Sequence, residues 1–426
     1  MEWLAWAAAL LLGGLAGYTL VPDLLVHRLG MGAWTRHYGP GVALTFDDGP
    51  DAHITPAVLD VLRRHGVKAT FFLVGERAAR HPGLVRRMVA EGHRLGAHSH
   101  RHRYPWFVSP WATWRDWEES VATIEAISGR PVEWVRPPWG TLNLATWAWV
   151  RARRRKLVLW NVEAHDWLVG RGPQRVADEV VRKARDGAIV LLHDAGGQPG
   201  APANTLRALD DLCHRVRQER KLALVLPDLP DWTLRRRLLF AAWEGWERVF
   251  ARLYQVERLD ATNIFRLGLS RYRGPELRGA DGSVAARSGD LVGEIHLDSL
   301  RLQDRGADAQ RSAARLLREA RESMRGLARH VASDPRFADV QVLLGYTLLQ
   351  AHARALGFHV QEMPPGWAPG LLGRWERLVM WVYRPTGRPP AGRHLRARPE
   401  LAWISRAELL ERWLPQASPA EEGAGA

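Results

Sequence analysis

Two adjacent carboxylates follow a short apolar run near the start of the sequence. Residues 42–46 read VALTF, and the chain continues as Asp47-Asp48-Gly49-Pro50. Adjacent carboxylates directly after a buried strand are costly unless something compensates them, and the Gly-Pro pair forces a turn. One carboxylate can bind a metal ion while its neighbour acts as a base. An ordinary acidic turn is the alternative.

A second polar cluster, HSHRH at residues 98–102, follows another apolar run. His98 and His102 are four residues apart and would share one face of a helix, where two imidazoles can clamp one cation. A solvated basic loop is the alternative, but the carboxylate pair after a different strand favours a metal site. Because Cys213 is the only cysteine, any metal must be held by His and carboxylate side chains.

Three further clusters carry groups that could orient charges or move protons. Residues 136–140 read RPPWG, where a guanidinium on a proline-stiffened loop can hold a carboxylate ionised and loop N–H groups can face an oxyanion. A rigid turn with a surface arginine is the alternative. Residues 191–194 read LLHD, and His193 can serve as a general acid when a carboxylate stabilises its protonated form. Residues 160–167, WNVEAHDW, contain two carboxylates.

Alternating strands and helices must position these clusters. Apolar runs predict strands at residues 42–46, 70–74, 94–97, 132–135, 157–160, 188–192 and 222–225. Segments with 3.6-residue periodicity predict helices at 56–65, 84–91, 114–127, 174–184 and 204–218. The alternation predicts a parallel sheet covered by helices, either a barrel or a doubly wound sheet. The five clusters follow five predicted strands, where both folds assemble active sites.

These blocks resemble the five motifs of the polysaccharide deacetylase family, the carbohydrate esterases that share the NodB homology domain. TFDDGP at residues 45–50 matches the first motif in full. The second, third and fifth motifs are matched by HSxxH at 98–102, RxPW at 136–139 and LxH at 191–193. The fourth motif fits most loosely, because Glu163 stands at its first position, although Asp166-Trp167 is retained. The resemblance covers about residues 41–227 and implies an α/β fold, a distorted (β/α)7 barrel.

The resemblance also implies a metal site and a base. Asp48, His98 and His102 would hold a divalent cation, with Zn²⁺ the default for two histidines and one carboxylate and Co²⁺ or Ni²⁺ as substitutes. Asp47 would be the catalytic base. Arg136 would tether the Asp47 carboxylate.

The acid and the substrate-binding residues follow from the same resemblance. His193 would be the catalytic acid, and Asp166 would tune it. Pro138, Trp139 and Trp167 are expected to contact the substrate, with the Trp139 N–H facing the oxyanion. The expected enzyme is a metal-dependent N-deacetylase hydrolysing acetamido groups of an N-acetylglucosamine-containing polysaccharide, such as peptidoglycan or chitin-like oligomers. Two alternatives are a deacetylase or deformylase of a lipid-linked sugar precursor and a degenerate glycan-binding barrel.

The N-terminal segment predicts a membrane anchor. No charged residue occurs between Trp3 and Val21, which is long enough for a transmembrane helix. The basic n-region of a cleaved signal peptide is missing, so a retained anchor over residues 1–25 is favoured. Arg28 and Arg36 weakly favour a cytoplasmic position for the following domain. Membrane anchoring of an enzyme of this family suggests a wall polymer or a lipid-linked sugar as the substrate. Against the weak arginine bias, the catalytic domain is expected to be extracytoplasmic.

Aromatic residues gather after the histidine cluster. They can stack on sugar rings or rest against a membrane surface, and helix packing is favoured for the last two. The group comprises Tyr104, Trp106, Phe107, Trp111, Trp114 and Trp117.

A proline-rich hinge, LPDLPD at residues 226–231, divides the sequence. The expected domains are the deacetylase domain at 38–228, a mainly helical α+β domain of unknown function at 232–414, and a disordered tail at 415–426. Within the second domain, helices are predicted at 233–254, 307–331 and 340–356, and a strand at 291–297.

Polar residues alternate along the predicted strand at 291–297. Glu294, His296 and Asp298 would share one face, where a solvated or partner-facing surface is favoured over a second metal site. The apolar stripe Leu316, Ala320, Met324, Leu327 and Val331 predicts ordinary helix packing.

The composition is that of a globular chain, with 46% hydrophobic and 25% charged residues. The net charge of +14 comes almost entirely from arginine, since only four lysines occur. The arginines are spread along the chain and form no single basic stripe, so nucleic acid is not an expected partner. The expected partners are a glycan substrate and the membrane, and the oligomeric state stays open.

Overall fold

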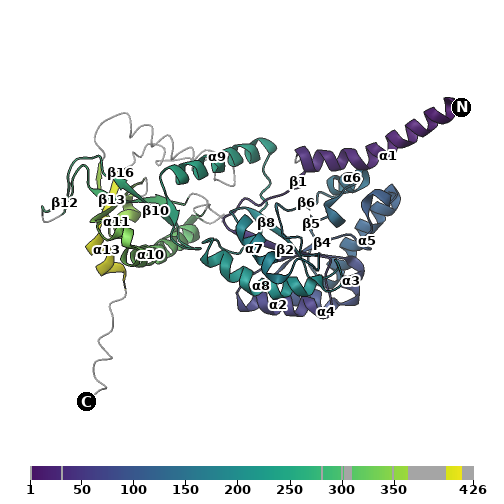
Figure 1. The fold of residues 1–426 in the computed structure, drawn as a ribbon, viewed down its shortest axis with the longest axis horizontal. Coiled ribbons are helices and arrows are strands. Elements are labelled where there is room, and N and C mark those ends of the chain that lie inside the picture. Colours follow the sequence, from purple (N-terminus) through teal and green to yellow (C-terminus); the bar gives the residue numbers. More distant parts are fainter. Residues whose placement is uncertain are drawn as a thin grey trace, which may run out of the picture. The chain divides into compact units, whose positions relative to one another are not determined.

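The computed structural model describes residues 2–29, 32–279, 282–298, 301, 309–347, 350–362 and 400–414 (Figure 1). The chain divides into two compact units, Met1–Leu229 and Pro230–Ala426, and each is described by itself. The tail expected at 415–426 lies outside the described residues.

The first unit is built on one sheet of eight strands in the order β1-β6-β5-β4-β3-β2-β8-β7. All neighbouring strands run parallel. The strands are β1 (Ala33–Trp34), β2 (Val42–Asp47), β3 (Thr70–Leu73), β4 (Arg94–Ala97), β5 (Trp134–Val135), β6 (Lys156–Val158), β7 (Val162–Glu163) and β8 (Ala188–His193). The sheet curls into a half-barrel with β1 and β7 at its edges. The expected α/β barrel-like fold is confirmed, in an open form.

One predicted strand of this unit is wrong. Residues 222–225 contribute an isolated bridge between Leu224 and Val42 rather than a strand. The proline-rich hinge at residues 226–231 follows directly, and Pro227 within it has no N–H to extend a ladder.

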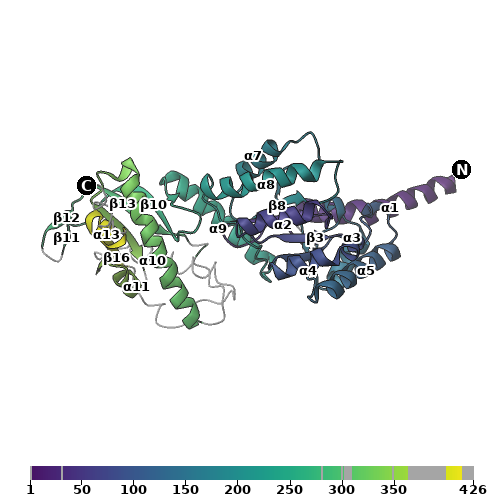
Figure 2. The ribbon, with the colours of Figure 1, turned by 90° about the horizontal axis from the view of Figure 1, so that it is seen from below.

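Helices cover the sheet (Figure 2) and, together with the sheet, bury its apolar runs in one core. They are α2 (Ile54–Arg64), α3 (Gly75–Arg80), α4 (Pro82–Ala90), α5 (Pro110–Ser128), α6 (Leu144–Ala152), α7 (Pro173–Lys183) and α8 (Ala201–Gln218). All residues of β2 are buried, as expected for a central parallel strand. On α2, Val58, Leu59 and Leu62 recur at helical spacing and pack into the same core. The carboxyl ends of the strands are thereby fixed on a rigid scaffold.

The N-terminal helix α1 (Glu2–Leu29) extends from the first unit (Figure 1). It contains, over Ala9–His27, the one span among the described residues that is long and apolar enough to cross a membrane. Its first half is exposed, whereas Thr19 and Val26 in its second half are buried against the unit. The helix is therefore both a candidate membrane segment and a packed element.

The second unit contains a six-stranded sheet in the order β15-β16-β14-β13-β10-β9. Its strands are β9 (Glu257–Arg258), β10 (Phe265–Arg271), β13 (Leu291–Leu297), β14 (Val342–Thr347), β15 (His359–Glu362) and β16 (Glu400–Ser405), beside a small sheet of β11 (Leu277–Arg278) and β12 (Val284–Ala286). Its helices are α9 (Leu234–Leu253), α10 (Ala309–Ser333), α11 (Gln350–Ala355) and α13 (Arg406–Trp413). The expected α+β class is confirmed.

The apolar stripe on α10 packs as predicted. Ala320, Met324, Leu327 and Val331 lie in the core of the second unit. The side chain of Leu316 lies outside the described side chains.

The helix predicted at 340–356 is wrong. Its first part is the buried strand β14, and α11 accounts for the second part. A short apolar run such as Val342-Leu343-Leu344 fits a buried strand and a helix equally well, so periodicity alone could not decide.

The solvated or partner-facing surface expected for Glu294, His296 and Asp298 is wrong for Asp298, whereas Glu294 and His296 are half-buried. Asp298 is fully buried. Its carboxylate forms ion pairs with Arg258 and Arg266, both at 2.9 Å, and lies 3.6 Å from Arg301. Burial by itself raises the pKa of Asp298, but these arginines outweigh it and lower the pKa to about 2. The aspartate is therefore a structural ion-pair centre.

Candidate active site

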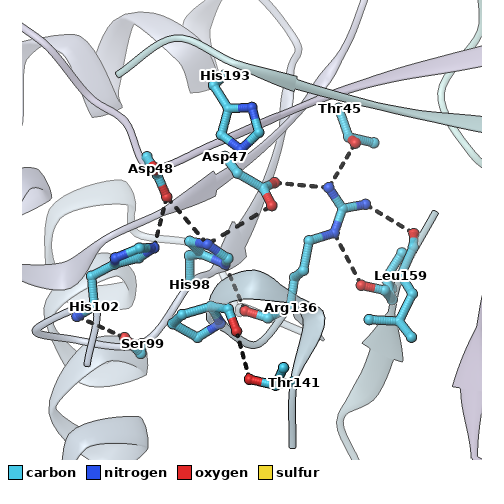
Figure 3. Close-up of polar contacts among 12 residues, drawn as sticks. Thr45, Asp47, Asp48, His98, Ser99, His102, Arg136, Thr141, Leu159 and His193 are labelled. Atoms are coloured by element: carbon cyan, nitrogen blue, oxygen red, sulfur yellow. Dashed lines mark hydrogen bonds and ion pairs between the residues drawn. The ribbon is translucent and has the colours of Figure 1, made fainter. Parts of the chain in front are cut away.

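The sheet register brings the sequence motifs to one edge. Asp47 at the end of β2 is the register partner of His193 at the end of β8 and of Phe72 on β3. One strand further along the sheet from β3, Ala97 at the end of β4 pairs with Val135 on β5. Parallel strands end at a common edge, so the loops after β2, β4, β5 and β8 converge there. Figure 3 shows their side chains pointing toward one another.

Asp48, His98 and His102 form a cluster with metal-ligand chemistry. Their ligand atoms all lie within 4.8 Å of one another. The Asp48 Oδ1 is 2.9 Å from His102 Nε2 and 3.3 Å from His98 Nε2. Burial by itself raises the pKa of Asp48, but its contacts with His102 and His98 outweigh burial and hold that pKa well below its usual range. The carboxylate is thus ionised and faces two imidazoles.

The tautomer of His98 fits a metal ligand. Its Nδ1 lies 2.7 Å from the carbonyl oxygen of Arg136, and a carbonyl can only accept, so Nδ1 carries the hydrogen. The Nε2 lone pair then points at the cluster. This backbone support of the second ring nitrogen is typical of metal-binding histidines. Two imidazole nitrogens and one carboxylate oxygen suit a divalent transition metal.

The predicted helical arrangement of His98 and His102 is wrong. Residues 98–102 form a loop after β4, in which Ser99 and His102 adopt positive φ angles of 63° and 52°. The His102 N–H donates to the Ser99 hydroxyl at 2.9 Å, which tightens the loop. The two rings still approach to 5.1 Å between centroids. Loop geometry, rather than helical spacing, brings them together.

Left-handed backbone concentrates around this site. Five of the eight non-glycine residues with positive φ among the described residues lie in the motif loops, and positive φ is uncommon for such residues. They are Asp48, Ser99, His102, Trp139 and His165.

Arg136 holds the carboxylate of Asp47. Its Nη1 donates to Asp47 Oδ1 and to the Thr45 hydroxyl, both at 2.7 Å. Its Nε and Nη2 donate to the carbonyl oxygens of Val158 and Leu159 at 3.1 and 3.0 Å. The guanidinium is completely buried, and burial lowers its pKa while Asp47 opposes that shift. The second Asp47 oxygen lies free of the guanidinium, toward the histidine cluster (Figure 3).

His193 is paired with Asp166. Its Nδ1 lies 2.9 Å from Asp166 Oδ1, and its backbone N–H donates to Oδ2 at 2.7 Å. The Thr205 hydroxyl also donates to that oxygen at 2.8 Å. Burial by itself lowers the pKa of His193, but Asp166 outweighs it and raises the pKa to about 9. His193 is therefore held protonated at neutral pH, with Nε2 left to face the cleft.

Two of the three predicted substrate-binding residues, Trp139 and Trp167, border a cleft beside these groups, and Pro138 does not. Trp139 is 54% exposed, and its ring lies 4.5 Å from that of His102, whereas Pro138 is buried beneath the loop. Trp167 contacts the His193 ring edge-on at 5.5 Å. The cleft is lined by Asp47, Asp48, Arg77, His98, His102, Trp139, Trp160, Glu163, Trp167, Leu191, His193, Gly196 and Gly197. Of the aromatic group, Trp117 is buried against Trp149, as predicted.

Sequence reasoning missed two residues that support this site. Arg77 on α3 donates to the backbone oxygen of Asp48 at 2.7 Å, and no motif marks it. Asp194 is fully buried and accepts a hydrogen bond from Thr55, and burial raises its pKa to about 7. Its place directly after His193 was the one available signal.

A second cluster of possible ligands lies in the other unit. Glu257, His330 and Asp334 have ligand atoms within 4.8 Å of one another. Arg336 already pairs with Glu257 and, at 2.6 Å, with Asp334. The cluster is an ion-pair network.

Comparisons with known proteins agree with this geometry. The polysaccharide deacetylase family profile matches residues 36–155, and the YkoP domain profile matches residues 236–413. A peptidoglycan-N-acetylglucosamine deacetylase of Bacillus cereus is 31% identical over 188 residues, 44% of this chain and 67% of the relative. A chitooligosaccharide deacetylase of a Bradyrhizobium species is 35% identical over 200 residues, 46% of this chain and 89% of the relative.

A solved structure, the peptidoglycan deacetylase PdaC of Bacillus subtilis, is 27% identical with a TM-score of 0.40 and covers 51% of this chain and 98% of that one. The chain belongs to the polysaccharide deacetylase family, as the motifs predict, and carries a YkoP domain after it. It is a hydrolase that acts on carbon–nitrogen bonds.

Proposed function

We propose that the chain is a metal-dependent N-deacetylase that hydrolyses acetamido groups of an N-acetylglucosamine-containing polysaccharide. The observation that carries this proposal is that Asp47 and His193, register partners on β2 and β8, line the same cleft as the cluster of Asp48, His98 and His102. Relatives named for peptidoglycan and chitooligosaccharide deacetylation support the substrate class. A degenerate glycan-binding barrel is disfavoured, because binding alone needs no base, acid and metal ligands together.

Asp48, His98 and His102 would hold the divalent cation, with Zn²⁺ the first choice for this donor set. When bound there, the cation supplies Lewis acidity toward the acetyl carbonyl and the attacking water. The fixed tautomer of His98 and the ionised carboxylate of Asp48 support this assignment.

Asp47 would remove the proton from the attacking water. Arg136 supports this role, because its guanidinium holds Oδ1 and leaves Oδ2 to accept the proton. The water oxygen adds to the acetyl carbon, and the oxyanion that forms would accept a hydrogen bond from the Trp139 N–H. Each of these interactions strengthens as charge develops in the transition state.

His193 would complete the reaction as the general acid. Its protonated form, favoured by Asp166, gives the Nε2 proton to the sugar nitrogen as the carbon–nitrogen bond breaks. The products are acetate and a free amino sugar. General acid and base groups each contribute about 10²- to 10⁴-fold, so loss of Asp47 or His193 should slow the reaction by about that factor.

We place the enzyme at the membrane through α1, with its catalytic domain outside the cytoplasm. The apolar span of α1 supports the first part, and the peptidoglycan-directed relatives support the second.

The test is acetate release from N-acetylglucosamine oligomers by the full chain in detergent with Zn²⁺. Asp47→Asn and Asp48→Ala should both abolish release, and Val169→Ser, at an exposed position, is the matched control. If Asp47→Asn keeps normal activity, the role of base is refuted. If the wild type binds Zn²⁺ yet releases no acetate, the site is real and the polymeric substrate is wrong.

A further inference from the structure

Two large aromatic side chains stand exposed beside the N-terminal helix. Phe107 is 86% exposed and Trp111 is 78% exposed, and they lie on either side of the start of α5. The two residues are four positions apart in the chain, and large apolar side chains that gather on a surface mark interaction sites. We use the name aromatic face for a set of five exposed residues: Phe107 and Trp111, together with Leu20, Val21 and Leu24 of α1.

The helix is fastened to the loops around this face. The Tyr18 hydroxyl donates to the carbonyl oxygen of Val108 at 2.8 Å, directly after Phe107. On the other loop, His27 Nε2 donates to the carbonyl oxygen of Gly140 at 2.9 Å, directly after Trp139. The α1 helix therefore contacts both aromatic loops at the mouth of the cleft, those that follow β4 and β5.

The apolar span of α1 overlaps its docked part. The span Ala9–His27, which is long and apolar enough to cross a membrane, includes the docked turns that carry Tyr18 and His27. On those turns Leu20, Val21 and Leu24 remain exposed. Since those turns pack at the level of Val108, the neighbouring Phe107 comes to the same level as the membrane interface. Tryptophan and other aromatic rings favour that zone.

A row of rings connects the aromatic face with the candidate metal site. The His102 ring lies 4.5 Å from Trp139, Trp139 lies 5.1 Å from Tyr104, and Tyr104 lies 5.6 Å from Phe107. Aromatic rings of this kind suit the apolar faces of sugars. A path for a glycan thus runs from the aromatic face to the cleft.

We propose that the aromatic face sits in the membrane interface and that the cleft takes a glycan still attached to a lipid of the same bilayer. The substrate half of this proposal rests on the proposed N-deacetylase function. The membrane half rests on α1 and the aromatic face alone. A lipid-tethered substrate meets this site at high effective concentration, whereas a soluble polymer gains nothing from it.

Depth labelling tests whether the aromatic face lies in the membrane interface, and it requires no enzymatic activity. Phe107→Cys, Trp111→Cys and the control Val169→Cys are each labelled with a fluorophore in the full chain in lipid nanodiscs. The native Cys213 is buried, which raises its thiol pKa to about 12 and keeps it unlabelled. Lipids brominated near the headgroup should quench the labels at 107 and 111 relative to unbrominated lipids, and leave the label at 169 unchanged. Equal quenching at all three positions, or none at 107 and 111, overturns the proposal.

Turnover tests the substrate half. The full chain in nanodiscs is given an N-acetylglucosamine-bearing polyprenyl lipid in the same disc or soluble N-acetylglucosamine oligomers. The wild type should prefer the tethered sugar, and the double variant Phe107→Ser/Trp111→Ser should lose at least about tenfold of that preference. The variant Val169→Ser should keep the preference. Equal rates on both substrates refute a tethered substrate. Absence of acetate release from either substrate refutes the proposed N-deacetylase function. In that case the labelling experiment alone tests whether the aromatic face lies in the membrane interface.

Discussion

Asp47 and His193 are register partners on the adjacent parallel strands β2 and β8. One is held through Oδ1 by Arg136, and the other through Nδ1 by Asp166. A proton acceptor and a proton donor are thus fixed by the sheet itself, and both line the same cleft. Sites on rigid strands keep such distances more closely than sites on loops.

The buried pair of Arg136 and Asp47 should dominate the stability of the catalytic unit. The change Arg136→Met leaves Asp47 buried without its partner, and breaking such a pair typically costs about 3–5 kcal/mol. Urea unfolding of the full chain in detergent measures the free energy of unfolding.

Adding Asp47→Asn to the Arg136→Met variant should recover part of that loss, because the uncompensated charge is gone. The carbonyls of Val158 and Leu159 still lack their donor, so recovery should be incomplete. A single variant as stable as the wild type would contradict the pairing argument.

Metal binding should depend on one of the two candidate clusters. Wild-type protein should bind one Zn²⁺ and gain about 2.7 kcal/mol of stability at 100 times the dissociation constant. Asp48→Asn and His98→Gln should remove both the bound ion and the gain. Calorimetry and thermal unfolding with and without chelator measure these quantities.

The matched control is Glu257→Gln in the second cluster, which Arg336 already neutralises. It should leave the Zn²⁺ stoichiometry unchanged. A loss of the bound ion in this variant would show that the site lies in the second unit.

Much of this architecture follows from sequence because strand ends carry the chemistry. The strands that end at Asp47 and His193 are buried on both faces and therefore appear in the sequence as continuous apolar runs. The ends of these strands can be located because each run stops at a polar residue. The α/β fold and the clustering of the motif residues follow from that pattern. The contact between His98 and His102 was expected for the wrong reason. Their spacing suggested a helix, but a loop with left-handed residues brings the two rings together.

Other features have no local signal. The donation of Arg77 to the Asp48 backbone joins residues on separate elements, and periodicity carries no information about it. The pairing of Asp298 with Arg258 and Arg266 joins residues far apart in the chain, so the alternation of polar residues at 294–298 suggested a solvated or partner-facing surface. The strand β14 was missed because three buried apolar residues fit either period.

The alkaline limb of activity should report the pairing of His193 with Asp166. A general acid must be protonated, and the folded pKa of His193 is raised to about 9, so kcat/KM should fall as pH rises through that value. In Asp166→Asn the raising charge is lost, and the limb should move to lower pH by about one unit or more. A pH profile between 6 and 10 on the same substrate measures it, with Asp178→Asn on the exposed face of α7 as the control. An unmoved limb would assign it to another group.

Stability should fall on the acid side of neutrality because of His93. Its side chain is fully buried, its Nδ1 accepts the Ala69 N–H at 3.1 Å, and its ring lies edge-on to Phe71. Burial, reinforced by Lys68, lowers the pKa of His93 to about 4. Since the folded pKa lies below the unfolded value of about 6.5, the neutral form stabilises the fold above that pH, and the contribution is lost as pH falls from about 6.5 to about 4.

The loss between pH 7 and pH 5 should be about 2 kcal/mol, from that shift of the pKa. Urea unfolding of the first unit, with chelator throughout to exclude metal effects, measures the slope. His93→Gln keeps an acceptor for the Ala69 N–H but cannot titrate, so its slope should be flatter by that amount. His53→Gln at an exposed position should keep the wild-type slope. Equal slopes in His93→Gln and the wild type would mean that His93 is protonated in the folded chain, with its imidazolium hydrated or paired.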